Sequence, residues 1–136
     1  MTRFATSFDP GGELIVVEGR IAGPQGSSGG RLVLDTGAAM TTITPELAHL
    51  LGYSARNGLR RTRVHTAVGS EEGYLLEVAA FVALGNVLQR FRVHVFDLGH
   101  DDIDGLIGLN FLRRLNYEIR SAEYRILVEQ AAQATT

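Results

Sequence analysis

Turn-forming residues interrupt this chain at short intervals, and the runs between them have the length and composition of β-strands. The segments 13–21 and 31–34 are rich in Val, Ile and Leu. Between them lies the Gly- and Ser-rich stretch 23–30, which is typical of a flexible hairpin connection. The first quarter of the chain is therefore predicted to be a β-hairpin.

A second hairpin is predicted further along the chain. The segment 75–84 is mostly apolar, Gly85-Asn86 has the composition of a tight turn, and the segment 91–96 alternates between apolar and polar residues. Such alternation is typical of a strand with one buried face. Strands dominate the sequence, which favours a small closed or sandwiched β-architecture.

Two short helices are expected. In the better one Thr44 is the N-cap, Pro45 occupies the first helical position, and Gly52 follows the last turn. The other covers 109–115 and would have about two turns. Both are brief insertions between strands.

The composition restricts the class of protein. A chain of 136 residues with 45% hydrophobic residues forms one domain with a real core. It has no cysteine, and its four histidines have no familiar ligand spacing, so neither a disulfide framework nor a metal site is expected. The net charge of −2 argues against a nucleic-acid binder. No signal peptide or membrane segment is seen, and a cytoplasmic location is the default expectation.

Order is expected from about residue 10 to residue 128, and the tail 129–136 is predicted to fray because it offers little to bury. All 13 basic residues are arginine, which we interpret as the coding bias of a GC-rich, bacterial source.

Two motifs carry the chemistry. The apolar strand 32–34 runs into Asp35-Thr36-Gly37-Ala38, and the later segment Leu106-Ile107-Gly108 leads into the second predicted helix, with Asn110 two places after the glycine. A lone Asp-Thr-Gly is equally typical of an aspartate that caps a turn. The two motifs together, in this order, resemble the retropepsin family of aspartic proteases.

The resemblance covers residues 13–128 and includes a candidate flap hairpin at 64–74. The inserted helix at 45–51, the flap core Thr66-Ala67-Val68-Gly69 and the segment 116–120 look more like the bacterial branch of the family than the viral one. The resemblance implies an all-β fold, a retropepsin-like closed barrel with one or two short helices. It also implies that the protein is active as a homodimer and needs no cofactor.

The chemistry of such a site needs two acids. Two carboxylates that share one proton can activate a water and protonate the carbonyl oxygen of a peptide bond. This chain has a single Asp-Thr-Gly, so the pair requires a two-fold dimer in which Asp35 of each subunit meets its counterpart. The predicted function is therefore an aspartic endopeptidase that acts on an extended polypeptide.

The resemblance also implies roles for individual residues. Asp35, Thr36 and Gly37 would be catalytic: the Thr36 hydroxyls would bond across the dimer axis, and the Gly37 amide would donate to the carboxylate. Ile103, Asp104 and Leu106 would lie near the wall of a specificity pocket, and the apolar residues there suggest apolar side chains next to the cleaved bond. The residues expected to bind substrate come from the two motifs and the flap, and they are Ala38, Thr66, Ala67, Val68, Gly69, Ile103, Leu106, Ile107 and Gly108.

Several alternatives stay open at this point. The hairpin at 64–74 could be an ordinary exposed hairpin, and its Glu71 and Glu72 could either favour basic substrates or be solvated. Ala39 and Leu109 stand where viral enzymes commonly have an Asp and Arg that pair, which leaves the dimer contacts undecided. Either the segment 125–128 or the segment 2–8 could join the subunits.

Two other functions compete with the protease. The chain could be a catalytically silent dimerisation or peptide-binding domain of the same fold, or a β-barrel binding module in which Asp-Thr-Gly is coincidental. A calcium loop at 100–111 is improbable because it would end at Phe111 where a Glu is needed. The arginines at positions 56, 60, 61 and 63 lack interleaved aromatic residues and are better explained as a solvated face than as a nucleic-acid site.

Overall fold

The computed structural model describes residues 3–66 and 69–130. Ten strands, two α-helices and two 3₁₀ helices follow one another in the order β1 (Arg3–Ser7), β2 (Val16–Gly23), β3 (Gly26–Leu34), β4 (Thr42–Ile43), α1 (Pro45–Leu50), η1 (Ala55–Asn57), β5 (Arg60–Thr66), β6 (Gly69–Ala83), β7 (Asn86–Val95), β8 (Gly105–Ile107), α2 (Leu109–Leu112), β9 (Leu115–Arg120), η2 (Ser121–Glu123) and β10 (Arg125–Gln130). No helix in these ranges is both long enough and apolar enough to cross a membrane.

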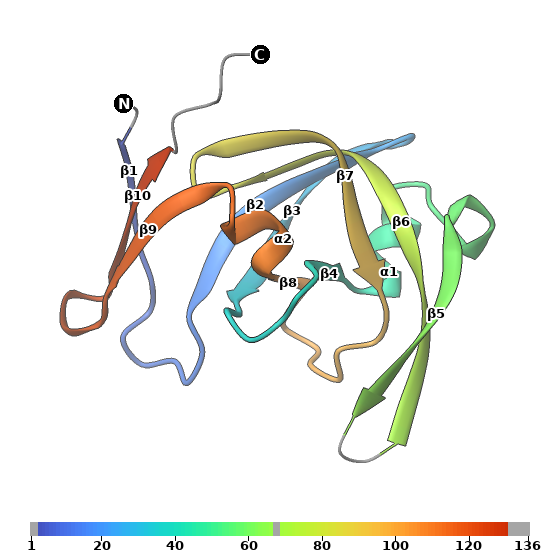
Figure 1. The fold of residues 1–136 in the computed structure, drawn as a ribbon, viewed down its shortest axis with the longest axis horizontal. Coiled ribbons are helices and arrows are strands. Elements are labelled where there is room, and N and C mark those ends of the chain that lie inside the picture. The colour runs from blue at the N-terminus through green and yellow to red at the C-terminus, as the bar shows by residue number, and fades with distance from the viewer. Residues whose placement is uncertain (1–2, 67–68, 131–136) are drawn as a thin grey trace.

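The main sheet closes into a barrel (Figure 1). Its strand order is β2-β3-β8-β4-β7-β6-β5. An additional pairing between β2 and β6 closes the six strands from β2 to β6 in this order into a ring. Strand β5 pairs with β6 alone and extends the sheet beyond the closed part. The predicted fold class, an all-β closed barrel with two short helices, is confirmed.

The core fills the inside of this barrel. Phe81, Phe91 and Phe111 form an aromatic triangle with ring centroids 5.3 to 5.8 Å apart, the spacing at which tilted aromatic rings attract one another. Tyr53 is also buried, and its hydroxyl accepts from the Ala79 amide at 3.0 Å, so its polar end is satisfied. The helix-derived Phe111 thereby anchors α2 to the strands of the barrel.

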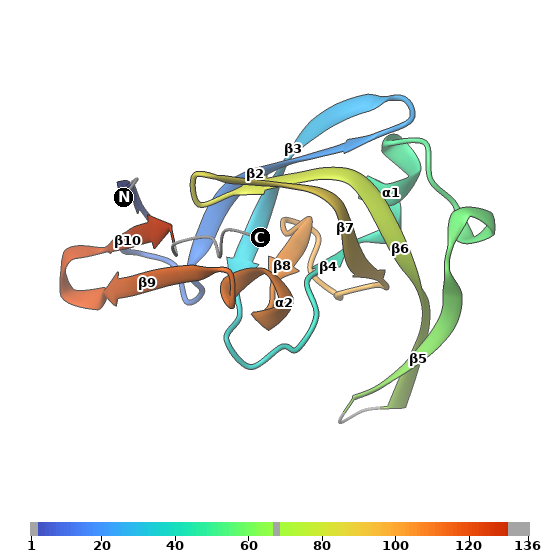
Figure 2. The ribbon, with the colours of Figure 1, turned by 45° about the horizontal axis from the view of Figure 1, so that its top comes forward.

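A second, three-stranded sheet has the order β1-β10-β9 (Figure 2). Its inner face carries Ile126 and Val128, both nearly inaccessible and part of the same core. Regular structure therefore begins at Arg3 rather than near residue 10, and β10 includes Glu129, beyond the predicted end of order at 128. The sequence alone does not predict β1, because it is a short, half-polar strand whose partner, β10, comes from the other end of the chain. Residues 131–136 lie outside the described part.

The first predicted hairpin is present, but its connection is not flexible. The strands turn at Pro24-Gln25, and the glycine-rich residues of the predicted loop are paired within β3, up to Gly23 opposite Gly26. One of these glycines is required by close packing: a Cβ on Gly23 would lie 2.6 Å from the Leu51 carbonyl oxygen. At this position glycine marks tight approach rather than a loop.

The second hairpin turns one residue earlier than predicted. Leu84 and Gly85 occupy the turn with φ of 51° and 74°, the two positive values of a type I′ turn, and Asn86 already pairs in β7. Leu84 accepts this conformation while its side chain is 2% exposed in the core. Burial of a leucine outweighs the local preference for glycine or asparagine at that position.

Helix α1 is confirmed, with Thr44 Oγ1 accepting from the Leu47 amide at 3.2 Å and Gly52 at φ 94° after its end. Helix α2 is shorter than predicted and ends at Leu112. Leu115, expected in its last turn, begins β9 and pairs with Gln130. The helix ends early because Leu115 pairs with a strand from the end of the chain. The residues around Leu115 give no sequence signal for this end.

Candidate active site

Asp35 lies where β3 ends against β8. The two strands are parallel, with Leu34 opposite Ile107, and the Asp35 amide donates to the Ile107 carbonyl at 3.0 Å. The chain then turns sharply, so that the Gly37 amide donates to Asp35 Oδ1 at 3.0 Å. This is the hydrogen bond that the resemblance implies for Gly37. The carboxylate is half-buried, while Thr36 and Gly37 are exposed.

Gly108 lets the second motif pack directly onto the first. A Cβ at this buried position would lie 2.6 Å from the backbone carbon of Met40 and 2.8 Å from the Ala38 carbonyl oxygen. The next residue, Leu109, donates its amide to that same Ala38 oxygen at 2.8 Å. Any side chain at 108 would therefore push the loop after Asp35 away from α2.

Two polar side chains complete this contact. Thr41 is fully buried, and its Oγ1 accepts from the Gly108 amide at 3.1 Å. Asn110 uses both ends of its amide: Oδ1 accepts from the Thr41 amide at 2.7 Å, and Nδ2 donates to the Arg92 carbonyl at 2.9 Å. The sequence analysis placed Asn110 in a motif without a role and missed Thr41, whose partner lies 67 positions away.

The departure from the viral pattern is accommodated by the backbone. Where viral enzymes have a charged pair, the Asn110 amide donates to the Ala39 carbonyl at 3.1 Å, next to the bond between Leu109 and Ala38. Ala39 and Leu109 carry no charge, so this contact between the two loops leaves no buried charge that needs a partner. Main-chain hydrogen bonds hold the two loops together in this chain.

The residues expected at the specificity wall, Ile103, Asp104 and Leu106, and the neighbouring Ile107 differ in accessibility. Leu106 is half-buried on β8, whereas Ile107 is fully buried and Ile103 is 7% exposed. The Asp104 carboxylate accepts from the Arg31 amide at 2.8 Å, so it fastens the loop before β8 to β3. Of these four, Leu106 is the apolar residue whose side chain stays partly accessible.

The candidate flap is the β5–β6 hairpin, which projects from the barrel (Figures 1 and 2). Its strands pair from Arg60 opposite Leu75 to Thr66 opposite Gly69. In both views the far ends of β5 and β6, where Thr66 pairs with Gly69, lie apart from the end of β3. Ala67 and Val68, predicted to bind substrate, lie outside the described residues.

Burial changes the proton affinity of two groups near this hairpin. Burial, and secondly the charge of Arg60, lowers the pKa of His94 below its ordinary value of 6.5. Burial raises the pKa of Tyr74. His94 lies on β7, where it pairs with Thr42 of β4. The Arg92 carbonyl of the same strand β7 accepts the hydrogen bond from Asn110.

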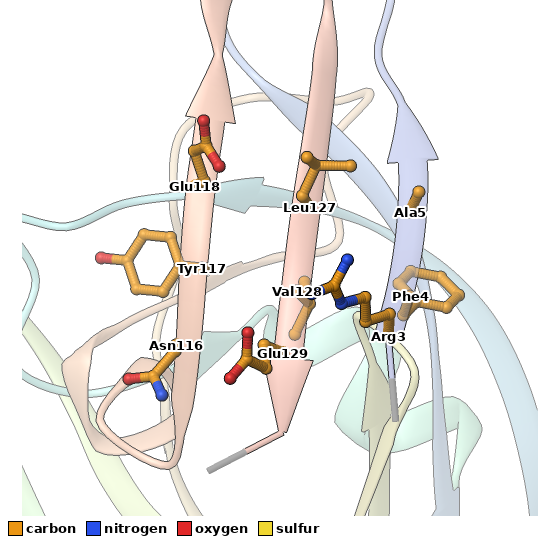
Figure 3. A pocket seen from close by; sticks show the side chains of 9 residues that line it. All are labelled: Arg3, Phe4, Ala5, Asn116, Tyr117, Glu118, Leu127, Val128 and Glu129. Atoms are coloured by element: carbon orange, nitrogen blue, oxygen red, sulfur yellow. The ribbon is translucent and has the colours of Figure 1, made fainter. Parts of the chain in front are cut away.

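A hollow of about 530 Å³ lies elsewhere, on the terminal sheet (Figure 3). Its lining comes from β1, β9 and β10 and consists of Arg3, Phe4, Ala5, Asn116, Tyr117, Glu118, Leu127, Val128 and Glu129. Asp35 is not among these residues. Strands β1 and β10, the described parts of the two segments expected to join subunits, lie side by side here in one sheet.

Comparison with solved structures gives the same fold. A retropepsin-like aspartic protease from Rickettsia conorii superimposes with a TM-score of 0.67 and 19% identity over 93% of this chain and 90% of that one. The EIAV protease in complex with the inhibitor HBY-793 gives a TM-score of 0.54 and 18% identity over 74% of this chain and 86% of its own. The retroviral protease-like domain of Ddi1 from Leishmania major gives 0.53 and 20%, over 77% and 79%.

A comparison with curated protein sequences finds no significant match. The profile of the aspartyl protease family matches residues 17–111, a range that contains both the Asp35 turn and the Gly108 loop. Together with the closed barrel and its structural matches, this establishes that the chain belongs to the aspartyl protease family and has the retropepsin-like fold.

Proposed function

We propose that this chain is an aspartic endopeptidase that cleaves peptide bonds as a homodimer. The observation that carries the proposal is the turn at Asp35: a half-buried carboxylate oriented by the Gly37 amide, on a loop held rigidly by Gly108. An acid that merely capped a turn would not need a second, distant loop packed against it. A positioned carboxylate is what acid–base catalysis requires.

The dimer follows from the chemistry. One carboxylate cannot both accept a proton from water and donate one to the substrate carbonyl, and the chain has one Asp-Thr-Gly. In the proposed dimer, ionised Asp35 accepts a proton from a water as its oxygen attacks the scissile carbonyl carbon. Protonated Asp35 of the partner subunit donates to the carbonyl oxygen. Collapse of the resulting diol breaks the C–N bond, and the amine leaves with a proton returned from the pair.

Four further parts of the proposal concern other groups of the site. The exposed Thr36 hydroxyl would bond across the dimer axis, and Leu106, half-buried on the same side of the sheet as Asp35, would contact apolar side chains next to the cleaved bond. The β5–β6 hairpin would close over an extended peptide and exclude water. Ala38, Ile107 and Gly108 would shape the backbone around it.

The test is cleavage of an unfolded protein from about pH 4 to 8 at concentrations where dimers are demonstrated, with wild type and Asp35→Asn side by side. We expect the variant to fold and dimerise but to lose cleavage. An Asn at this position keeps the shape and the Gly37 hydrogen bond and removes the acid–base function. Wild-type dimers without activity would favour the silent, peptide-binding alternative.

Dilution separates the dimer from a monomeric mechanism. If two copies of Asp35 form the site, specific activity falls as the protein is diluted below its dimer dissociation constant. Specific activity that stays constant while sedimentation shows monomers would contradict a shared site.

A further inference from the structure

Another hollow lies at the base of the β5–β6 hairpin. Its volume is about 590 Å³, and its lining comes from η1 and both hairpin strands: Ala55, Arg61, Thr62, Arg63, Glu72, Gly73 and Tyr74. Tyr74 shares a face of β6 with the core residue Leu76. Asp35 directly follows the core residue Leu34 and therefore points to the opposite face of the sheet. The hollow is thus separate from the candidate active site.

The Tyr74 ring is packed against η1 in this hollow. A Cβ on Gly58 would lie 2.9 Å from Tyr74 Cδ2 and 3.0 Å from the Ala55 carbonyl oxygen, so the missing side chain lets the ring and η1 come together. Burial raises the pKa of Tyr74, and its hydroxyl stays protonated at neutral pH. Within residues 3–66 and 69–130 this hydroxyl makes no hydrogen bond and is not fully buried. It is therefore a donor that a ligand can reach.

Two arginines line the same face of the hairpin. Arg61 stands directly opposite Tyr74, and it has no carboxylate within ion-pair distance in the described part of the chain. Arg63 pairs with Glu72 at 2.9 Å, but both side chains are more than half exposed, and such pairs contribute little to stability. Two arginines and one glutamate give the lining a net charge of +1.

We propose that this hollow binds the phosphate group of a small organic molecule, with Arg61, Arg63 and the Tyr74 hydroxyl as hydrogen-bond donors. Guanidinium groups match the oxygens of a phosphate and bind them with charge-assisted hydrogen bonds. The volume lies in the range of about 300–1,000 Å³ that is usual for small-molecule sites, so it leaves room for an organic body beside the phosphate. The Tyr74 ring offers that body an apolar surface.

A ligand in this hollow would restrain the hairpin. It would touch η1 at Ala55 and both hairpin strands, and a ligand stabilises the conformation to which it binds. In that conformation the far ends of β5 and β6 lie apart from the end of β3 (Figures 1 and 2). This part of the inference rests on the proposed function, in which the hairpin closes over the peptide. We therefore expect slower cleavage when the phosphate is bound.

Calorimetric titration with phenyl phosphate and with inorganic phosphate, in chloride of matched ionic strength, tests the site. We expect one phenyl phosphate per chain, bound more tightly than inorganic phosphate because its ring contacts Tyr74. Arg61→Gln should weaken binding about fivefold, as for an exposed ion pair. Tyr74→Phe keeps the ring and should also weaken binding. Arg60→Gln is the matched control, because it removes the same charge from the other face of β5.

Three results overturn the site. They are no binding of either phosphate to wild type, equal weakening by Arg60→Gln and Arg61→Gln, and equal affinity for the two phosphates, which would mean an inorganic ion only. Because binding is measured without catalysis, a protein that binds phenyl phosphate but cleaves nothing would contradict the proposed function and support the site.

The effect on the hairpin is measured separately, with a peptide that the wild-type protein cleaves. We expect increasing phenyl phosphate to slow cleavage by wild type and to have less effect on Arg61→Gln at the same concentration. A wild-type rate that is unchanged when the site is saturated overturns the restraint on the hairpin.

Discussion

The Gly108 amide donates a hydrogen bond of 3.1 Å to Thr41 Oγ1, and this bond connects the loop that follows Asp35 to the loop that precedes α2. Both residues are buried, so water cannot replace either partner. The turn at Asp35 is thus held from two directions, by β3 behind it and by Gly108 beside it.

Thr41→Val should destabilise the protein by about 1–3 kcal/mol, because valine has the same shape but leaves the Gly108 amide unsatisfied. Urea unfolding measures the change. Thr41→Ser keeps the hydroxyl and should retain most of the stability. A Val variant as stable as wild type would mean that the Gly108 amide finds another partner.

Gly108→Ala should also cost about 1–3 kcal/mol, by overpacking, since the new Cβ would meet Met40 carbon at 2.6 Å. The loop after Asp35 must move to make room. We therefore expect the rate of cleavage to fall by more than the loss of folded protein alone would explain. Gly29→Ala is the control: the nearest atom to its Cβ is 3.7 Å away, an ordinary contact. Equal effects of the two substitutions would argue against steric contact at 108.

The rate of cleavage should depend on pH as a bell with its maximum on the acid side of neutrality. One proton must be shared by the pair, and two carboxylates in contact titrate in two separate steps. Initial rates on a single peptide, measured across the stable pH range, give both limbs. A rate that stays flat to pH 9 is incompatible with a carboxylate pair.

His94 should make the fold less stable in mild acid. Its pKa in the folded chain lies below the ordinary 6.5, so the unfolded chain binds the proton more readily. The corresponding stability is present above about pH 6.5 and is lost as pH falls through the folded pKa. His94→Gln should therefore lose less stability than wild type between pH 7.5 and pH 5, measured by urea midpoints.

His49→Gln, at an exposed position of α1, serves as the control for the pH experiment and should follow the wild-type dependence. A His94 variant with the wild-type pH dependence would show that other groups dominate acid unfolding in this range.

Much of the local structure could be read along the chain, because it depends on neighbouring residues. Thr44, Pro45 and Gly52 bound helix α1 through bonds within a few residues, and alternation over 91–96 predicts a strand with one buried face. The Asp35 and Gly108 motifs are local too, which is why the family could be suggested from them and candidate site residues named.

Other features depend on partners that are distant in sequence. Leu34 meets Ile107 across a parallel ladder, β1 pairs with the last strand, and the Thr41 hydroxyl finds the Gly108 amide 67 positions away. Local patterns cannot report such pairs, since many distant segments offer equivalent hydrogen-bonding groups. Closure of the barrel selects among them, because it is the arrangement that buries the apolar faces and satisfies the backbone at the same time.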